Sequence, residues 1–230
     1  MSGLILGKFF NWTRLCQSHA VQLPPLTDLT ALLGINLVLC AAGLHLLATR
    51  SSSARWAGWT MLSCFVFLWL PAGVAHLPLV AYVRGITSDL SVTLVALACF
   101  AIGKCLFGLP ALGRRNRLTL SSAIVVAATV LYPTALGWGD WDAYRLGWGS
   151  FSMLGMLLAL VMVFWLIGIR LLPMLVGLAL LAWVTGWMES TNLWDYLIDP
   201  WLAVGATIQC ITAGGQALAD RYRRDPVARQ

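Results

Sequence analysis

Charge is what this sequence has least of. Of its 230 residues only 10% are Asp, Glu, Lys or Arg, whereas about 25% is usual for a soluble domain. Hydrophobic residues make up 60% of the chain and the mean hydropathy is +0.81. A soluble fold of this size cannot hide so much apolar surface, because its surface is too large relative to its volume. The scarcity of charge therefore excludes a soluble domain and indicates a protein that lies in a lipid bilayer.

Several motifs that carry chemistry are also missing from the sequence. The six cysteines form no Cys-x-x-Cys pair, and all but Cys16 fall inside apolar runs. This argues against a disulfide framework or a zinc site. The sequence has no Walker loop, no Gly-x-Ser-x-Gly elbow and no histidine pair suited to haem or two metals. We therefore expect no cofactor and no metal. The net charge of +6 does not indicate a nucleic-acid partner, because in a membrane protein the location of charge matters more than its sum.

Long apolar runs are abundant, and each is about as long as a helix that crosses the hydrocarbon layer. The runs are too continuous for the alternating strands of a membrane barrel, and helices pair every backbone group inside lipid. The prediction is an all-α polytopic transmembrane bundle over residues 29–218, between an interfacial N-terminal segment at 1–28 and a basic tail at 219–230. The seven predicted spans are 29–48, 57–79, 90–109, 119–136, 150–169, 173–189 and 200–218.

Basic and acidic residues are distributed unequally between the two sets of connections. One set holds ten arginines: Arg50, Arg55, Arg114, Arg115, Arg117, Arg170, Arg221, Arg223, Arg224 and Arg229. The other set holds four basic residues, Lys8, Arg14, Arg84 and Arg145, with most of the carboxylates. Basic loops stay in the cytoplasm, so the C-terminus is expected inside and the N-terminus outside. The expected location is a bacterial inner (plasma) membrane.

The three loops on the expected outer side, 84–91, 136–150 and 188–201, mix aromatic and acidic residues. Tryptophan and tyrosine form an aromatic belt at membrane interfaces, but a belt does not explain the carboxylates among them. One hypothesis is that these loops recognise a lipid headgroup, a glycan or a partner protein. An arginine there would form two parallel hydrogen bonds to a phosphate. The candidate binding residues are Arg84, Trp141, Tyr144, Arg145, Trp194, Asp195 and Asp199.

A second hypothesis for the same face is catalysis. His76 lies near the outer end of the second predicted span, and Asp89 lies at the start of the third, so the two could form an acid–base couple. Asp140, Asp142 and Glu189 complete the candidate catalytic set. No glycine-rich calcium loop follows the Asp-x-Asp pair, so these residues are not assigned to a metal.

The sequence leaves three classes of function open. The favoured one is an accessory or scaffold protein of a cell-envelope system, whose outer loops bind membrane lipids or another envelope protein. The first alternative is a membrane-embedded enzyme that modifies a lipid or lipid-linked substrate at the outer leaflet. The second is a small transporter, which is disfavoured because Lys104 is the one formal charge well inside a predicted span and ion pathways use several such groups.

Overall fold

The computed structural model describes residues 26–48 and 54–224. Within these ranges the chain is almost entirely helical, which confirms the all-α prediction. The α-helices are α2 (Leu26–Ala48), α3 (Ala54–Leu68), α4 (Leu79–Thr87), α5 (Val92–Phe107), α6 (Arg114–Ala135), α7 (Phe151–Leu166), α8 (Leu171–Val184), α9 (Leu193–Leu197) and α10 (Pro200–Arg224). A 3-10 turn, η1 (Ala143–Gly147), and a hairpin of two short strands, β1 (Pro71–Ala72) and β2 (Leu77–Pro78), complete the fold.

Helix length and composition identify a multi-pass integral membrane protein, as the sequence predicts. Helices α2, α6 and α10 are long and apolar enough to cross a membrane, and α3, α5, α7 and α8 are shorter apolar helices. Large apolar side chains face outward along these helices, and more than half of each of Val126, Leu158, Leu181 and Val204 is exposed. Such a surface is unfavourable in water but is compatible with lipid tails.

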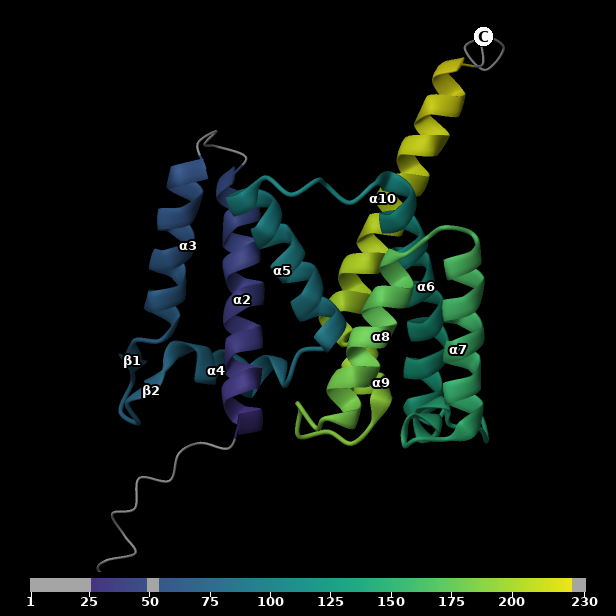
Figure 1. Ribbon diagram of the computed structural model, residues 1–230, viewed down its shortest axis with the longest axis horizontal. Helices are drawn as coiled ribbons and strands as arrows, with labels where there is room; N and C mark the ends of the chain where they lie inside the picture. The colour runs from purple at the N-terminus through teal and green to yellow at the C-terminus, as the bar shows by residue number, and fades with distance from the viewer. Residues whose placement is uncertain (1–25, 49–53, 225–230) are drawn as a thin grey trace, which may run out of the picture.

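The described chain runs back and forth between the two ends of the molecule through α2, α3, α5, α6, α7, α8 and α10 (Figure 1). Helices α2, α3 and α5 form one side, and α6, α7, α8 and α10 form the other. The hairpin, α4, η1 and α9 gather at one end, which we call the carboxylate end. The opposite end, here the arginine end, holds the start of α6 with Arg114, the α7–α8 connection with Arg170 and the C-terminal part of α10. The predicted segregation of charge between two faces is thus visible in the fold.

The largest apolar core joins α6, α7, α8, α9 and α10 with η1, and Tyr196, Met153 and Leu175 are its largest fully buried side chains. Two smaller clusters pack α2 against α4 and α5 around Ile35, and against α3 and α5 around Cys40. Helix α5 contacts both α2 and α8, so it connects the two sides of the bundle.

The prediction of a continuous helix over 57–79 is wrong, because α3 ends at Leu68. Pro71 has no backbone N–H and cannot continue a helical hydrogen-bond ladder. The chain instead enters the hairpin, whose turn contains Gly73 and His76 at positive φ, and α4 starts after it.

Two helices extend past the predicted segment boundaries. The first turn of α2 includes Asp28, which the sequence assigned to the N-terminal segment, and the remainder of that segment, 1–25, lies outside the described residues. Helix α10 continues through Arg224 into the predicted tail, of which residues 225–230 also lie outside the described part.

Candidate functional site

A cavity of about 1240 Å³ lies at the carboxylate end, between α2 and α4 on one side and α6, α9 and α10 on the other. Its lining combines residues far apart in the sequence, from Asp28 to Trp201. Among the described residues, five carboxylates and one cation, the Arg84 guanidinium, line it. The carboxylates belong to Asp28, Asp89, Glu189, Asp195 and Asp199. We call this space the acidic cavity.

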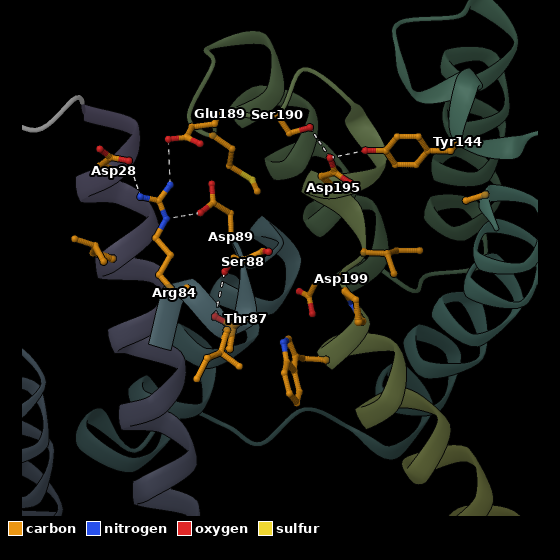
Figure 2. Close-up of a pocket in the computed structure, with 18 of the residues that line it drawn as sticks. Asp28, Arg84, Thr87, Ser88, Asp89, Tyr144, Glu189, Ser190, Asp195 and Asp199 are labelled. Carbon is orange, nitrogen blue, oxygen red and sulfur yellow. Dashed lines mark hydrogen bonds and ion pairs between the residues drawn. The ribbon is translucent and has the colours of Figure 1, made fainter. Parts of the chain in front are cut away.

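Arg84, in the last turn of α4, is bonded to three of these carboxylates. Its Nε donates to Asp89 Oδ1 at 2.8 Å, Nη1 to Asp28 Oδ1 at 2.5 Å and Nη2 to Glu189 Oε1 at 3.2 Å (Figure 2). Burial alone would lower the pKa of Arg84, but its hydrogen bonds to Asp89 and Asp28 outweigh burial and raise that pKa. Arg84 therefore ties α4 to α2 and to the α8–α9 loop as a permanent cation.

The turn between α4 and α5 has a strained backbone at the cavity wall. Ser88 adopts φ 58° and ψ −166°, and its N–H caps α4 by donating to Arg84 O at 2.9 Å. This region is nearly restricted to glycine, and a side chain there costs about 1–3 kcal/mol. The turn directs Asp89 back toward the guanidinium, as Figure 2 shows. The strain is concentrated beside the cavity, where functional sites commonly store it.

Asp195, on α9, lies on the opposite wall and accepts two hydroxyl donors. Tyr144 Oη donates to Asp195 Oδ2 at 2.9 Å, and Ser190 Oγ donates to the same oxygen. Burial, followed by the bond to Asp195, raises the pKa of Tyr144 to about 12, so its phenol is a protonated donor at neutral pH. The Tyr144–Asp195 pair faces the Arg84 group across the cavity (Figure 2).

Asp199 is buried and holds the starts of two helices together. Its Oδ2 accepts from the Ser91 backbone N at 2.9 Å and Ser91 Oγ at 2.5 Å, and its Oδ1 accepts from Leu202 N at 2.8 Å. Ser91 caps α5, while Asp199 caps α10, in which Pro200 suits the first helical position. The positive ends of both helix dipoles stabilise this one carboxylate.

The wall that carries Tyr144 is fixed by contacts between η1 and the α8–α9 segment. Asn192 Nδ2 donates to Tyr144 O at 2.9 Å, and Trp194 Nε1 donates to Ala143 O at 3.0 Å. Gly147 packs directly on both side chains: a Cβ there would lie 1.8 Å from Asn192 Oδ1 and 2.7 Å from Trp194 Cδ1. Trp194, predicted as a binding residue, is therefore buried in the wall and orients Tyr144.

The structure brings together some of the predicted residues and separates others. Asp89, Glu189, Asp195, Asp199, Arg84 and Tyr144 all line the acidic cavity. His76 lies in the exposed hairpin turn and is not part of that lining, while Asp89 bonds Arg84. Asp140, Trp141 and Arg145 are exposed near η1, and Asp142 Oδ1 caps η1 by accepting from Tyr144 N at 2.9 Å.

Sequence reasoning missed several polar residues of this region, among them Asp28, Ser91, Tyr132 and Ser190. Tyr132 is the most informative, because its buried Oη has no hydrogen-bond partner within the described part of the chain and it lines the acidic cavity. Buried polar atoms are nearly always bonded, so an unpaired one in a cavity wall is suited to a ligand. The sequence signal for Tyr132 was its place beside Pro133, at the carboxylate end of a span.

In the described ranges, no three His, Cys, Asp or Glu side chains are grouped so that they could hold a metal ion. The chain matches no protein-family model, no curated protein and no solved structure. The geometry of the cavity is therefore the basis for a functional proposal.

Proposed function

We propose that this protein binds, without altering it, an ammonium-bearing lipid headgroup in the acidic cavity at the outer face of the membrane, as an accessory or scaffold protein of the cell envelope. The proposal depends on one observation: five carboxylates surround a space of about 1240 Å³ whose one cation, among the described residues, is already bonded to three of them.

Electrostatics favour a cationic group in this space over a phosphate. A unit charge 4 Å from an opposite charge near a protein surface gains about 4 kcal/mol at an effective dielectric constant of about 20. Each of the three nitrogens of Arg84 is bonded to a carboxylate. The guanidinium therefore has no free pair of parallel N–H donors with which to bind a phosphate. A neutral glycan would gain hydrogen bonds here but no compensation of charge.

Aromatic and hydroxyl groups complete the proposed site. Tyr132, Tyr144 and Trp201 line the cavity with the carboxylates, and aromatic faces attract ammonium groups. The unpartnered Tyr132 Oη supplies a hydrogen bond to the headgroup. Binding is favoured over catalysis because Asp89 and Glu189 are both bonded to Arg84, and His76 does not line the cavity.

Substitution of two cavity residues tests this function. We expect Asp195→Asn to weaken binding of glycerophosphoethanolamine by about tenfold and Tyr132→Phe by about fivefold, which corresponds to one lost hydrogen bond. Because Tyr132 Oη has no protein partner, Tyr132→Phe should leave the melting temperature unchanged or raise it. Calorimetric titration of the full chain in detergent measures the affinity.

Asp140→Asn is the matched control, since Asp140 is exposed and does not line the cavity; its affinity should equal that of the wild type. Glycerophosphoglycerol, which lacks the ammonium, should bind more weakly than glycerophosphoethanolamine. Equal or tighter binding of glycerophosphoglycerol, or conversion of either probe into a product, would refute the proposal.

The proposed orientation places the carboxylate end outside the cell. In a background from which the native cysteines are removed, Asp140→Cys should react with a membrane-impermeant maleimide in intact cells. Arg115→Cys, at the start of α6, should react only after the cells are permeabilised, because basic ends stay in the cytoplasm. The reverse labelling pattern would invert the topology and place the acidic cavity on the cytoplasmic side.

A further inference from the structure

A second hollow, an apolar groove of about 720 Å³, runs along α6 beside α7 and α8. Leu118 and Phe164 line it toward the arginine end, and Trp141 and Leu146 line it toward the carboxylate end. Val126, Val130 and Met156 line the groove and are also exposed. The groove is therefore open at the side of the bundle, between helices that belong to its membrane-embedded part.

The apolar groove and the acidic cavity adjoin each other. Leu131 and Ile198 line both spaces, so the two spaces meet at these side chains. The part of α6 that lines the groove, residues 118 to 131, is roughly 20 Å long at about 1.5 Å per residue. One leaflet of hydrocarbon is half of the roughly 30 Å core, so the groove is long enough for the chain of a lipid in the outer leaflet.

We propose that the apolar groove holds the hydrocarbon chain of the same lipid whose ammonium headgroup lies in the acidic cavity, and that the lipid enters sideways between α6 and α7. This inference rests on the proposed function, which supplies the headgroup site. The groove defines the chemical class of the bound ligand, which is an amphiphile rather than a water-soluble amine or a peptide.

The two spaces have the complementary chemistry that one amphiphile requires. The groove wall is mainly Leu, Val, Ala and aromatic carbon, with few hydroxyls such as Thr119 and Ser122, so it suits a chain that makes no hydrogen bonds. The cavity wall is acidic, so it suits a cation. An apolar peptide helix would leave these carboxylates without a counter-charge. An ammonium lipid supplies a cation to the acidic cavity and a hydrocarbon chain to the apolar groove.

The experiment fills the groove without altering the cavity. Ala127 lines the groove and is half-buried, so Ala127→Trp places an indole where the chain would lie. Val130→Trp, at an exposed lining position, is a second variant in case the first does not fold. Thr129→Trp is the matched control, because Thr129 is exposed on the same helix and does not line the groove.

Two probes are compared on the full chain in detergent: long-chain phosphatidylethanolamine, by native mass spectrometry, and glycerophosphoethanolamine, by calorimetry. The wild type should bind the long-chain probe at least about 100-fold more tightly than the fragment, because buried methylenes add affinity. Ala127→Trp and Val130→Trp should each weaken binding of the long-chain probe by about tenfold or more. Their affinity for glycerophosphoethanolamine should equal that of the wild type. Thr129→Trp should match the wild type.

The possible failures are distinguishable. If Asp195→Asn weakens both probes while Ala127→Trp and Val130→Trp change neither, the chain lies elsewhere and the inference is overturned, but the headgroup site stands. If Asp195→Asn and Tyr132→Phe leave both probes unaffected, the proposed function falls and the inference falls with it.

Discussion

Gly147→Ala is expected to destabilise the protein by about 3–5 kcal/mol, because the new Cβ would overlap buried atoms that cannot move cheaply. That Cβ would lie 1.8 Å from Asn192 Oδ1 and 2.7 Å from both Asn192 Cγ and Trp194 Cδ1. Asn192 and Trp194 are both buried and hold η1 through hydrogen bonds to Tyr144 O and Ala143 O. Relief of the overlap therefore breaks those bonds, and the wall that positions Tyr144 is lost with them.

Thermal unfolding of the detergent-purified chain, followed by size-exclusion chromatography, measures this effect. Gly155→Ala is the control, because it adds the same methyl group in α7, where a Cβ would meet no atom within 4 Å. Its expected effect is a gain of roughly 0.5–1 kcal/mol from helix propensity. Equal melting temperatures for the two variants would show that η1 does not dock on α9 as described.

Arg84→Met is expected to lower the stability by about 2–3 kcal/mol at neutral pH, since it leaves Asp28, Asp89 and Glu189 together without a counter-charge. This magnitude allows for solvent screening, because the Glu189 side chain is 60% exposed. The acid side of the pH dependence should weaken. In the wild type, the hydrogen bond from Arg84 is the largest cause that lowers the pKa of Asp28, so the stability from this pair is present at neutral pH and is lost as the pH falls through that lowered pKa. The variant lacks the pair, so this loss of stability should be absent.

Melting temperatures recorded across an acid-to-neutral pH series test this change in pH dependence. Arg145→Met, which removes an exposed arginine near η1 that does not line the cavity, should keep the stability and pH dependence of the wild type. If Arg84→Met follows the same pH curve as Arg145→Met, Arg84 does not stabilise the contact of α4 with α2 and the α8–α9 loop.

The fold was predictable where the composition of a segment is sufficient to determine its secondary structure. Long apolar runs can satisfy their backbone hydrogen bonds only as helices in lipid. This reasoning found the seven apolar helices of residues 26–48 and 54–224, three of which are long enough to cross a membrane. It failed at 57–79, where the composition stays apolar but Pro71 and Gly73 impose a hairpin. It also predicted an outer loop over 188–201, although Asn192, Leu193 and Tyr196 are almost completely buried there. Burial of a short segment depends on partners elsewhere in the chain, and periodicity does not report those partners.

The candidate site was predictable as a face but not as a set of contacts. Counting charges on each side gathered Arg84, Glu189, Asp195 and Asp199 on one surface, and the structure places all four in one cavity. The pairings were hidden because they join distant positions: Ser91 and Asp199 are 108 residues apart and Arg84 and Glu189 are 105 apart. Arg84 was predicted to bind phosphate, since nothing in its neighbourhood of the sequence shows that three acids converge on it.

The position of Asp199 limits how the molecule can move. Its carboxylate accepts hydrogen bonds from Ser91, which caps α5, and it also caps α10 itself. Helix α5 packs with α2 and α3, and α10 packs with α6. Translation of one half of the bundle away from the other would break the bonds between Asp199 and Ser91 and expose a buried charge. Rotation about this shared carboxylate keeps its bonds to both helix starts. We therefore expect the acidic cavity to widen by a tilt of the two halves about Asp199. The displacement should be largest far from Asp199 and almost zero beside it.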